Sequence, residues 1–271
     1  MPFLETEPGV MLHWAELGTG RPVVFVHGWS MSSCVFDWQA DSLAATHRVI
    51  RYDLRGHGRS RCAAAGHAIE DHARDLEALL DRLDLRGAAL VAWSMGSQVA
   101  LEASPAIQDR LSALVLLSAT PRFTAGEDWP HGLPTASVRA LAARLEHRPE
   151  RTLQRFFDGM FVPGEIGDPE RAGIARRVLT DAPPVSLLAA RAGLEALLVS
   201  DQRMRLREVR VPTLLLHGEL DPICLPAASA FVEARIPGAR RRTLPGTGHA
   251  PHLSRPSLVN EELAGFLAEL P

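Results

Sequence analysis

Short apolar segments recur along the chain, and each ends in residues that favour turns. Within them Val, Ile and Leu follow one another with few polar residues between, which is typical of parallel strands covered by helices on both faces. The intervening segments, such as IEDHARDLEALLDRLDL (69–85), carry apolar residues at helical spacing. This alternation predicts an α/β fold with a doubly wound, mostly parallel sheet. The expected strands are RPVVFVHGW (21–29), HRVIRYDLRGHGRS (47–60), AALVAWSMG (88–96), LSALVLLSAT (111–120) and VPTLLLHGELD (211–221).

Two further segments are expected at the edges of this sheet. GVMLHWAELG (9–18) alternates more regularly between apolar and polar residues, which predicts an antiparallel pair at one edge. RRRTLP (240–245) is short and follows the last helical pattern before the C-terminal region, so it is a candidate for the final strand.

The strand pattern is interrupted between residues 121 and 191. This segment contains helical stretches such as ASVRALAARLEH (136–147), with Pro and Gly between them and no clear strand. We therefore expect a core formed by residues 1–120 and 192–271, with residues 121–191 as a helical cap over the carboxyl ends of the strands, where open α/β sheets bind ligands. The alternative is a separate helical domain in series, but the strand pattern resumes at Val211, which favours an insertion.

Charge and composition exclude several classes of function. The net charge of −3 argues against general nucleic-acid binding, and no apolar stretch approaches the roughly 20 residues that span a bilayer. The N-terminus lacks the pattern of a secretory signal, and the odd number of cysteines (Cys34, Cys62 and Cys224) predicts free thiols. The chain contains no lysine, which excludes Schiff-base lysine chemistry. We expect a cytoplasmic monomer without membrane contact.

The segment VAWSMG (91–96) has the pattern small-x-Ser-x-Gly between an expected strand and an expected helix. This pattern at such a junction describes a nucleophile elbow, a sharp turn that exposes a serine hydroxyl. Gly96 leaves the room that the turn needs, whereas Ala92 stands where glycine is usual. The pattern occurs by chance in many sequences, and its position at a strand end is what makes Ser94 a candidate nucleophile.

A serine hydroxyl needs a general base and a carboxylate that orients the base. Asp221 ends an expected strand, and His249 lies in a later loop, so that Ser94, Asp221 and His249 occur in the order found in α/β-hydrolases. Two alternatives remain open at this point: His252 competes with His249 as the base, and Glu219 competes with Asp221 as the acid.

The backbone N–H groups of Met95 and Trp29 are the expected donors of an oxyanion hole. The Trp29 indole would then form a wall of the pocket, although a tryptophan packed in the core is the alternative. We interpret His27 as a structural hydrogen-bonding residue. No role is expected for the histidines placed in turns or on polar helix faces, which are His57, His67, His72, His131 and His147.

Several motifs in this order resemble the α/β-hydrolase superfamily over nearly the whole chain. They are HGW (27–29), DLRGHGRS (53–60), WSMG (93–96), HGELDP (217–222) and GTGHAPH (246–252). HGWSMSSCVF (27–36), AWSMG (92–96), SATPRFTAGEDWP (118–130) and GHAPHLSRP (248–256) are more closely similar to the family of pimeloyl-[acyl-carrier protein] methyl ester carboxylesterases of biotin synthesis. In that family a serine hydrolase removes the methyl group from a pimeloyl ester held on acyl-carrier protein, without a metal or organic cofactor.

The resemblance implies roles for individual residues. It makes Ser94 the nucleophile, Asp221 the orienting acid and His249 the base, and it assigns Trp29 and Met95 to the oxyanion hole and the acyl pocket. RFFDGM (155–160) aligns with a stretch of the family's cap that lines the acyl channel. The resemblance therefore implies substrate contacts for Phe156, which matches by identity, and for Phe157 and Met160, which do not.

The resemblance also implies that Arg151 and Arg155 dock the acidic carrier protein. Positive charge exceeds negative charge in this part of the cap, where Arg139, Arg144, Arg148, Arg151 and Arg155 face only Glu146 and Glu150. The alternative is a solvated helix face stabilised by salt bridges.

The sequence thus predicts a serine carboxylesterase that acts on the methyl ester of pimeloyl-acyl-carrier protein. The alternatives are a general short-chain carboxylesterase, a lactonase, a carbon–carbon bond hydrolase or an acyltransferase on the same catalytic residues, because specificity depends on the cap and pocket. A receptor with the same fold and no catalysis is the alternative from another class.

Overall fold

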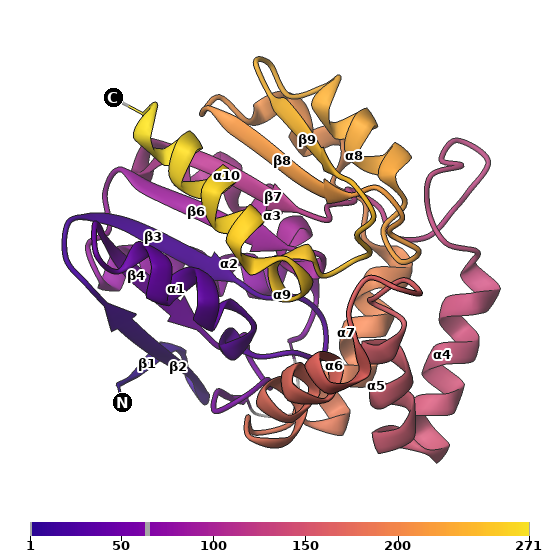
Figure 1. Ribbon diagram of the computed structural model, residues 1–271. Coiled ribbons are helices and arrows are strands. Elements are labelled where there is room, and N and C mark those ends of the chain that lie inside the picture. Colours follow the sequence, from indigo (N-terminus) through magenta and orange to yellow (C-terminus); the bar gives the residue numbers. More distant parts are fainter. Residues whose placement is uncertain (1, 63–65, 271) are drawn as a thin grey trace.

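The computed structural model describes residues 2–62 and 66–270, and a twisted sheet runs through its centre (Figure 1). The strand order is β1-β2-β4-β3-β6-β7-β8-β9, with β5 paired to β2. All pairs from β4 to β9 are parallel, so the predicted doubly wound, mostly parallel sheet is confirmed. The strands are β1 (Phe3–Glu7), β2 (Val10–Leu17), β3 (Arg21–Val26), β4 (His47–Tyr52), β5 (Arg61–Cys62), β6 (Ala88–Trp93), β7 (Leu111–Leu117), β8 (Thr213–Gly218) and β9 (Arg240–Leu244).

Both predicted edges of the sheet are also confirmed. Strand β2 pairs antiparallel with β1 and with β4, as the alternating pattern of residues 9–18 predicts. Strand β9 lies parallel to β8 and closes the other edge with the short basic run Arg240–Leu244.

Helices cover both faces of the sheet. Helices α1, α9 and α10 pack on one face, and α2, α3 and α8 pack on the other (Figure 1). Their bounds are α1 (Asp37–Leu43), α2 (Ile69–Arg82), α3 (Met95–Ile107), α8 (Pro226–Glu233), α9 (Pro251–Ser254) and α10 (Pro256–Ala268), and the short 3₁₀ helices are η1 (Ser33–Phe36), η2 (Gln108–Arg110) and η4 (Arg203–Glu208).

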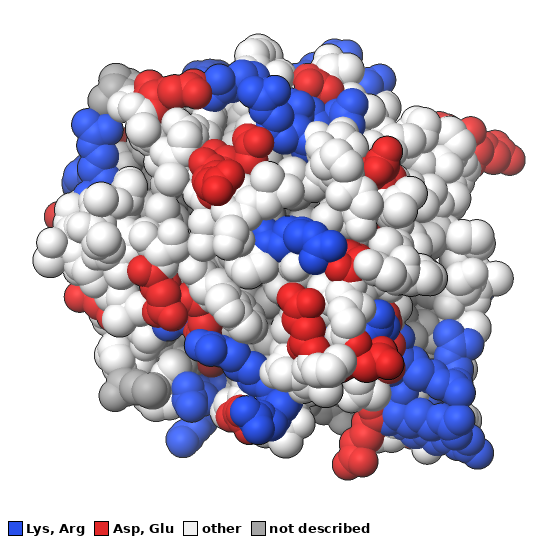
Figure 2. Space-filling model, in the orientation of Figure 1, with Lys and Arg blue, Asp and Glu red and all other residues white. Residues whose placement is uncertain are grey.

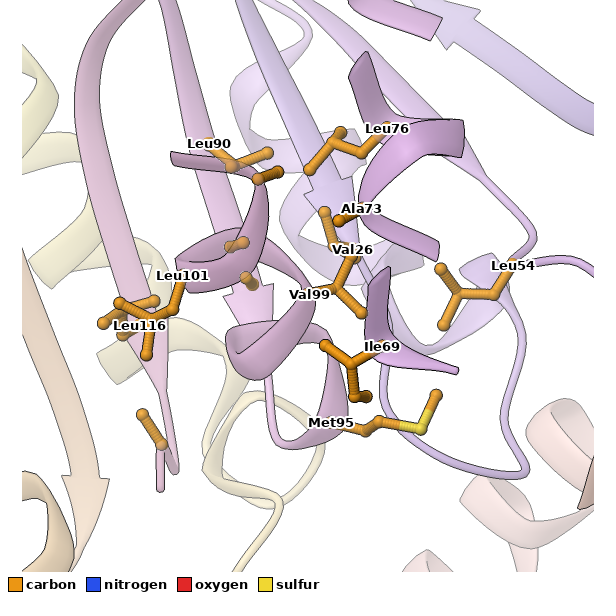
Figure 3. Close-up of a cluster of buried hydrophobic side chains, with 14 of the residues drawn as sticks. Val26, Leu54, Ile69, Ala73, Leu76, Leu90, Met95, Val99, Leu101 and Leu116 are labelled. Atoms are coloured by element: carbon orange, nitrogen blue, oxygen red, sulfur yellow. The ribbon is translucent and has the colours of Figure 1, made fainter. Parts of the chain in front are cut away.

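The apolar core on the α2 and α3 side holds the central strands in place. Figure 3 shows side chains of these two helices directed at strand residues, among them Ile69, Leu76, Val99, Leu101, Val26, Leu90 and Leu116. All of these side chains are buried, and burying each one stabilises the fold by about 1.5–3 kcal/mol. The ends of strands β6 and β8, which carry the candidate active site, are therefore rigid.

The helices of the segment after β7 lie together beside the sheet, at the lower right of Figure 1. They are α4 (Thr135–His147), α5 (Pro149–Asp158), α6 (Asp168–Ala175), the π-helical turn η3 (Arg176–Thr180) and α7 (Leu187–Val199). We propose these helices as the cap. The boundary predicted at residue 191 falls inside α7, because the apolar run LLAARAGLEALLV contains no helix-breaking residue at that point.

The helices, the cysteines and the possible metal ligands bear on the classes of function considered in the sequence analysis. None of the helices in the described part of the chain is both long and apolar enough to cross a membrane. Cys34 and Cys224 are free thiols. Within residues 2–62 and 66–270, no group of three or more His, Cys, Asp or Glu side chains is arranged to hold a metal ion.

Gly96 provides a test of how closely the elbow packs on β3. A methyl group at this position would lie 2.5 Å from the carbonyl oxygen of Val26 and 2.6 Å from that of His27, so backbone would have to move. We expect Gly96→Ala to lower the free energy of unfolding by about 1–3 kcal/mol, measured by urea denaturation. Gly265→Ala on the exposed face of α10, where a methyl group meets open space, should instead raise it by about 0.5–1 kcal/mol. Equal effects of the two substitutions would contradict this account.

Candidate active site

Ser94 lies at the sharp turn between β6 and α3. Its backbone has φ 56° and ψ −121°, a strained conformation that costs a non-glycine residue about 1–3 kcal/mol. The turn is stabilised by a hydrogen bond from the Ser94 N–H to the Leu117 carbonyl at 3.0 Å. Ala92, the departure from the usual pattern, is buried, and its carbonyl accepts a hydrogen bond from the Ser97 hydroxyl at 3.1 Å. The additional methyl group at Ala92 thus fits without disturbing the elbow.

The structure brings Ser94, His249 and Asp221 together. The Nε2 atom of His249 is 2.9 Å from the Ser94 hydroxyl oxygen, and its Nδ1 atom is 2.8 Å from Oδ2 of Asp221. The His249 and Asp221 side chains are completely buried. With a proton on Nδ1, the imidazole donates to the carboxylate and accepts from the serine hydroxyl, which is the geometry of a Ser–His–Asp triad.

The Asp221 carboxylate is held ionised by its surroundings. Its Oδ1 atom accepts hydrogen bonds from the N–H groups of Ile223 at 2.8 Å and Cys224 at 2.9 Å. Burial by itself raises the pKa of this carboxyl, but His249 and His217 outweigh that effect and hold its pKa well below the usual range. Asp221 therefore stays negatively charged at neutral pH and can stabilise an imidazolium at His249.

His217 is a neighbour of the triad that the sequence analysis did not identify. Its Nε2 atom is 3.3 Å from Oδ2 of Asp221, the oxygen that His249 also contacts, and 2.7 Å from the Cys224 carbonyl oxygen, so it helps to fix the carboxylate. His217 lies near the end of β8, four residues before Asp221, but this spacing alone does not reveal the contact.

The geometry decides between the competing residues. Both ring nitrogens of His252 lack a hydrogen-bond partner in the described part of the chain, and the ring packs against Trp93 and Phe36. Burial lowers the pKa of His252 to about 3, which keeps it neutral. The exposed Glu219 accepts a hydrogen bond from the Gly246 N–H at 3.0 Å. His249 and Asp221 are therefore the pair that serves Ser94.

The backbone N–H groups of Trp29 and Met95 are both available as donors. Neither donates a hydrogen bond to any group within the described residues. Met95 is the first residue of α3, so its N–H also lies at the positive end of the helix dipole. These two N–H groups are candidates for an oxyanion hole.

The Trp29 indole is buried between the core and the cap. Its Nε1 atom donates to the Ala190 carbonyl of α7 at 2.7 Å, and its ring meets Phe156 of α5 edge to face with centroids 4.7 Å apart. Gly193 permits this packing, because a methyl group there would lie 2.8 Å from the indole ring. Trp29 is thus part of the core cluster and also contacts a residue that lines the cap cavity.

An apolar cavity of about 450 Å³ lies between the cap and the loop after β8. It is lined by Phe156 together with Phe123, Leu133, Val138, Leu141, Pro222 and Ile223. Two of its lining residues, Pro222 and Ile223, directly follow Asp221 in the chain, and the Ile223 N–H is bonded to the Asp221 carboxylate. Arg144, Thr152 and Arg155 line this cavity and also a second groove of about 640 Å³ on the cap surface.

Phe157 and Met160 lie outside the lining of this cavity, unlike Phe156. Phe157 is completely buried and packs against Phe161, and Met160 is buried in the same apolar cluster. The reason is helical geometry, because Phe157 is turned about 100° around α5 from Phe156. Met160 reaches the site through its backbone instead, and its carbonyl accepts the His249 N–H at 2.7 Å.

His27 has the structural role that we expected. Its Nε2 atom accepts a hydrogen bond from the Leu54 N–H at 2.9 Å, and its Nδ1 atom is 2.8 Å from the Gly28 carbonyl oxygen. The loop that carries Trp29 is thereby tied to the loop after β4. Burial lowers the pKa of His27, so it remains a neutral bridge at physiological pH.

His57, His67 and His72 are not solvated side chains of turns or polar helix faces, and the expectation that His72 lies on a polar face of its helix was wrong. All three are buried, and His57 lies between the rings of His27 and His72 at centroid distances of 5.3 and 6.2 Å. Burial lowers the pKa of His57 to about 3 and that of His72 well below its usual range. Such histidines pack as neutral, largely apolar rings. Because histidine is counted as a polar residue, a hydrophobicity pattern in the sequence does not predict this burial.

Residues 21–256 match the family described as "alpha/beta hydrolase fold". The chain belongs to the α/β-hydrolase family. The pimeloyl-[acyl-carrier protein] methyl ester esterase of Nitrosomonas europaea is similar to this hydrolase, with 34% identity over 245 residues that cover 90% of this chain and 95% of the relative. The non-heme chloroperoxidase of Burkholderia pyrrocinia is 31% identical and covers 98% of this chain and 99% of its own.

Solved structures agree with this assignment. The esterase of Exiguobacterium antarcticum superposes with a TM-score of 0.92 at 27% identity, covering 98% of this chain and 99% of the esterase. Together with the arrangement of Ser94, His249 and Asp221, the family and these relatives identify the chain as a serine hydrolase with esterase chemistry.

The two neighbouring histidines allow a direct test of the base. We expect His249→Gln to lower kcat for a small aryl ester by about 10³-fold or more, because no group then accepts the serine proton. His252→Leu, which replaces a buried ring without hydrogen-bond partners, should change kcat by less than about 3-fold. Steady-state kinetics of the two purified variants measures both effects, and a larger loss for His252→Leu would contradict the assignment.

Proposed function

We propose that this hydrolase cleaves the methyl ester of a pimeloyl chain carried on acyl-carrier protein. The observation that carries the proposal is that two hollows meet in the cap: an apolar cavity, lined in part by Pro222 and Ile223 after Asp221, shares Arg144, Thr152 and Arg155 with a groove rich in arginine. A carrier-bound ester would match both surfaces, because it has an apolar chain at the reacting end and an acidic protein at the other end. The relative from Nitrosomonas europaea is named as an esterase of this same methyl ester.

In the proposed mechanism, His249 accepts the proton of Ser94 as the serine oxygen attacks the ester carbonyl carbon. The N–H groups of Trp29 and Met95 stabilise the oxyanion. The bond to the methoxy group then breaks, and methanol leaves with the proton from His249. Water next attacks the acyl-enzyme and gives a proton to His249, which passes it to the Ser94 oxygen as the acyl–oxygen bond breaks. This restores the Ser94 hydroxyl, and the carboxylic acid that is released loses its proton to solvent. Asp221 stabilises the imidazolium in each half of the reaction.

The groove arginines support docking of an acidic partner. Arg144, Arg148, Arg151 and Arg155 line this groove at the ends of α4 and along α5, and all four are exposed. Within the described residues none of them forms a salt bridge, whereas Glu146 pairs with Arg191 of α7. Figure 2 shows basic side chains gathered at the lower right, over α4 and α5. Unpaired guanidinium groups favour a surface for carboxylates or phosphate over a helix face stabilised by its own salt bridges.

A charge reversal in this groove tests the proposed substrate. Arg151 lines the groove but not the apolar cavity, so we expect Arg151→Glu to lower kcat/KM for the carrier-linked pimeloyl methyl ester by about tenfold, through weaker docking. The ratio of kcat/KM for this substrate to that for a small aryl ester should fall by the same factor.

Arg207→Glu is the matched control, because Arg207 is an exposed arginine of η4 outside the cap groove. It makes the same change in net charge and should leave the ratio within about twofold. An unchanged ratio in Arg151→Glu, or no preference of the unmodified enzyme for the carrier-linked ester, would favour a general carboxylesterase or lactonase.

A further inference from the structure

The turn between α5 and α6 contacts the loop that carries His249. The Met160 carbonyl accepts the His249 N–H at 2.7 Å, and Glu165 of the same turn accepts the neighbouring Gly248 N–H at 3.0 Å. Two successive peptide groups of the catalytic loop are therefore bonded to the cap rather than to the sheet.

Glu165 is a buried carboxylate, with only 3% of its surface exposed. Its Oε2 atom accepts hydrogen bonds from Val162 at 2.8 Å and from Gly248, and its Oε1 atom accepts the Ser254 hydroxyl. Within the described residues it forms no salt bridge, so these donors replace the water that the carboxylate loses. Val162 belongs to the cap, whereas Gly248 and Ser254 flank His249, so the carboxylate joins the cap to both sides of the catalytic loop.

The loop has little freedom to move relative to these contacts. A methyl group at Gly248 would lie 2.4 Å from the Met160 carbonyl oxygen, so the loop backbone is already in close contact with the cap turn. On its other side, the His249 carbonyl accepts the Trp93 indole N–H at 2.9 Å, which ties it to the residue before Ser94. The backbone of His249 is thus held between the elbow and the cap, and its ring between Ser94 and Asp221.

We propose that Glu165 is a positioning residue for the catalytic base, and that it couples the seating of the cap to the placement of the His249 imidazole. The inference rests on the proposed role of His249 as the base, and it names a residue outside the triad and the substrate cavity. A displacement of a reacting group by about 1 Å can reduce a rate by about 10²-fold. Loss of the Glu165 contacts should therefore lower kcat, with little effect on the binding of a small substrate.

The test compares Glu165→Ala with Glu165→Gln, using p-nitrophenyl acetate as substrate and a fluorophosphonate as a probe of Ser94. Glu165→Ala removes both acceptor oxygens and all three hydrogen bonds, and we expect kcat and the labelling rate to fall together by about 10–100-fold, with KM within about threefold. In Glu165→Gln the amide oxygen can accept from Val162 and Gly248 while the Ser254 hydroxyl accepts from the amide N–H, so both rates should recover to within about fivefold of the unmodified enzyme.

Arg177→Ala controls for a general loosening of the cap. Arg177 forms a salt bridge with Asp37 at 2.7 Å and so joins the cap to the core away from His249. This variant should keep kcat within about twofold. If Glu165→Ala keeps its kcat, if Glu165→Gln is as slow as Glu165→Ala, or if Arg177→Ala is equally slow, the positioning role is wrong.

If Glu165→Ala does not fold, Glu165→Asp can be used to test the same role. It keeps the negative charge but is shorter by one methylene, so it cannot reach Gly248 while bonded to Val162, and kcat should fall by about 5–10-fold. An Asp variant with unchanged kcat would overturn the proposal. If the carrier-linked ester proves not to be the substrate, these results still hold, because p-nitrophenyl acetate does not use the groove. If the triad assignment is wrong, a Ser94→Ala enzyme will still hydrolyse the ester, which is a separate result.

Discussion

The imidazole of His249 joins a serine at the end of β6 to an aspartate after β8, and those partners are 155 and 28 positions away in the sequence. Three side chains from separate elements meet within hydrogen-bond distance only if the strand ends are fixed relative to one another. The parallel register of β6, β7 and β8 and the apolar layers on both faces supply that rigidity. The strained backbone conformation of Ser94 persists for the same reason, because the surrounding packing holds it in place.

The cap completes the site in two ways. Helix α7 accepts the Trp29 indole N–H through Ala190, and the turn after α5 accepts two N–H groups of the His249 loop. The cap therefore contacts the loop of one candidate oxyanion donor and the loop of the base, and its cavity and groove form the route that we propose for the substrate. In this proposal, the segment that sets specificity also helps to hold the catalytic groups.

The features that the sequence could predict are those with a local pattern. Continuous apolar runs identified the strands, and the elbow pattern, with Asp221 and His249 in the right order, identified the residues that the structure brings together. The missed features depend on contacts between distant segments. Burial of His57 and His72, the role of His217 beside Asp221, and the inward orientation of Phe157 follow from packing that no local pattern encodes. The same is true of Glu165, which appears in the sequence as an ordinary acidic residue in a Pro- and Gly-containing turn.

The central claim is that Ser94 is a nucleophile activated by His249 and Asp221. Mass spectrometry of the protein after treatment with a fluorophosphonate tests it most directly, alongside ester hydrolysis by the same sample. The account predicts one covalent adduct, located on Ser94, with loss of hydrolysis in proportion to labelling, and neither labelling nor hydrolysis in a folded Ser94→Ala variant. An adduct on another residue, or a Ser94→Ala protein that retains most of its activity, would contradict it.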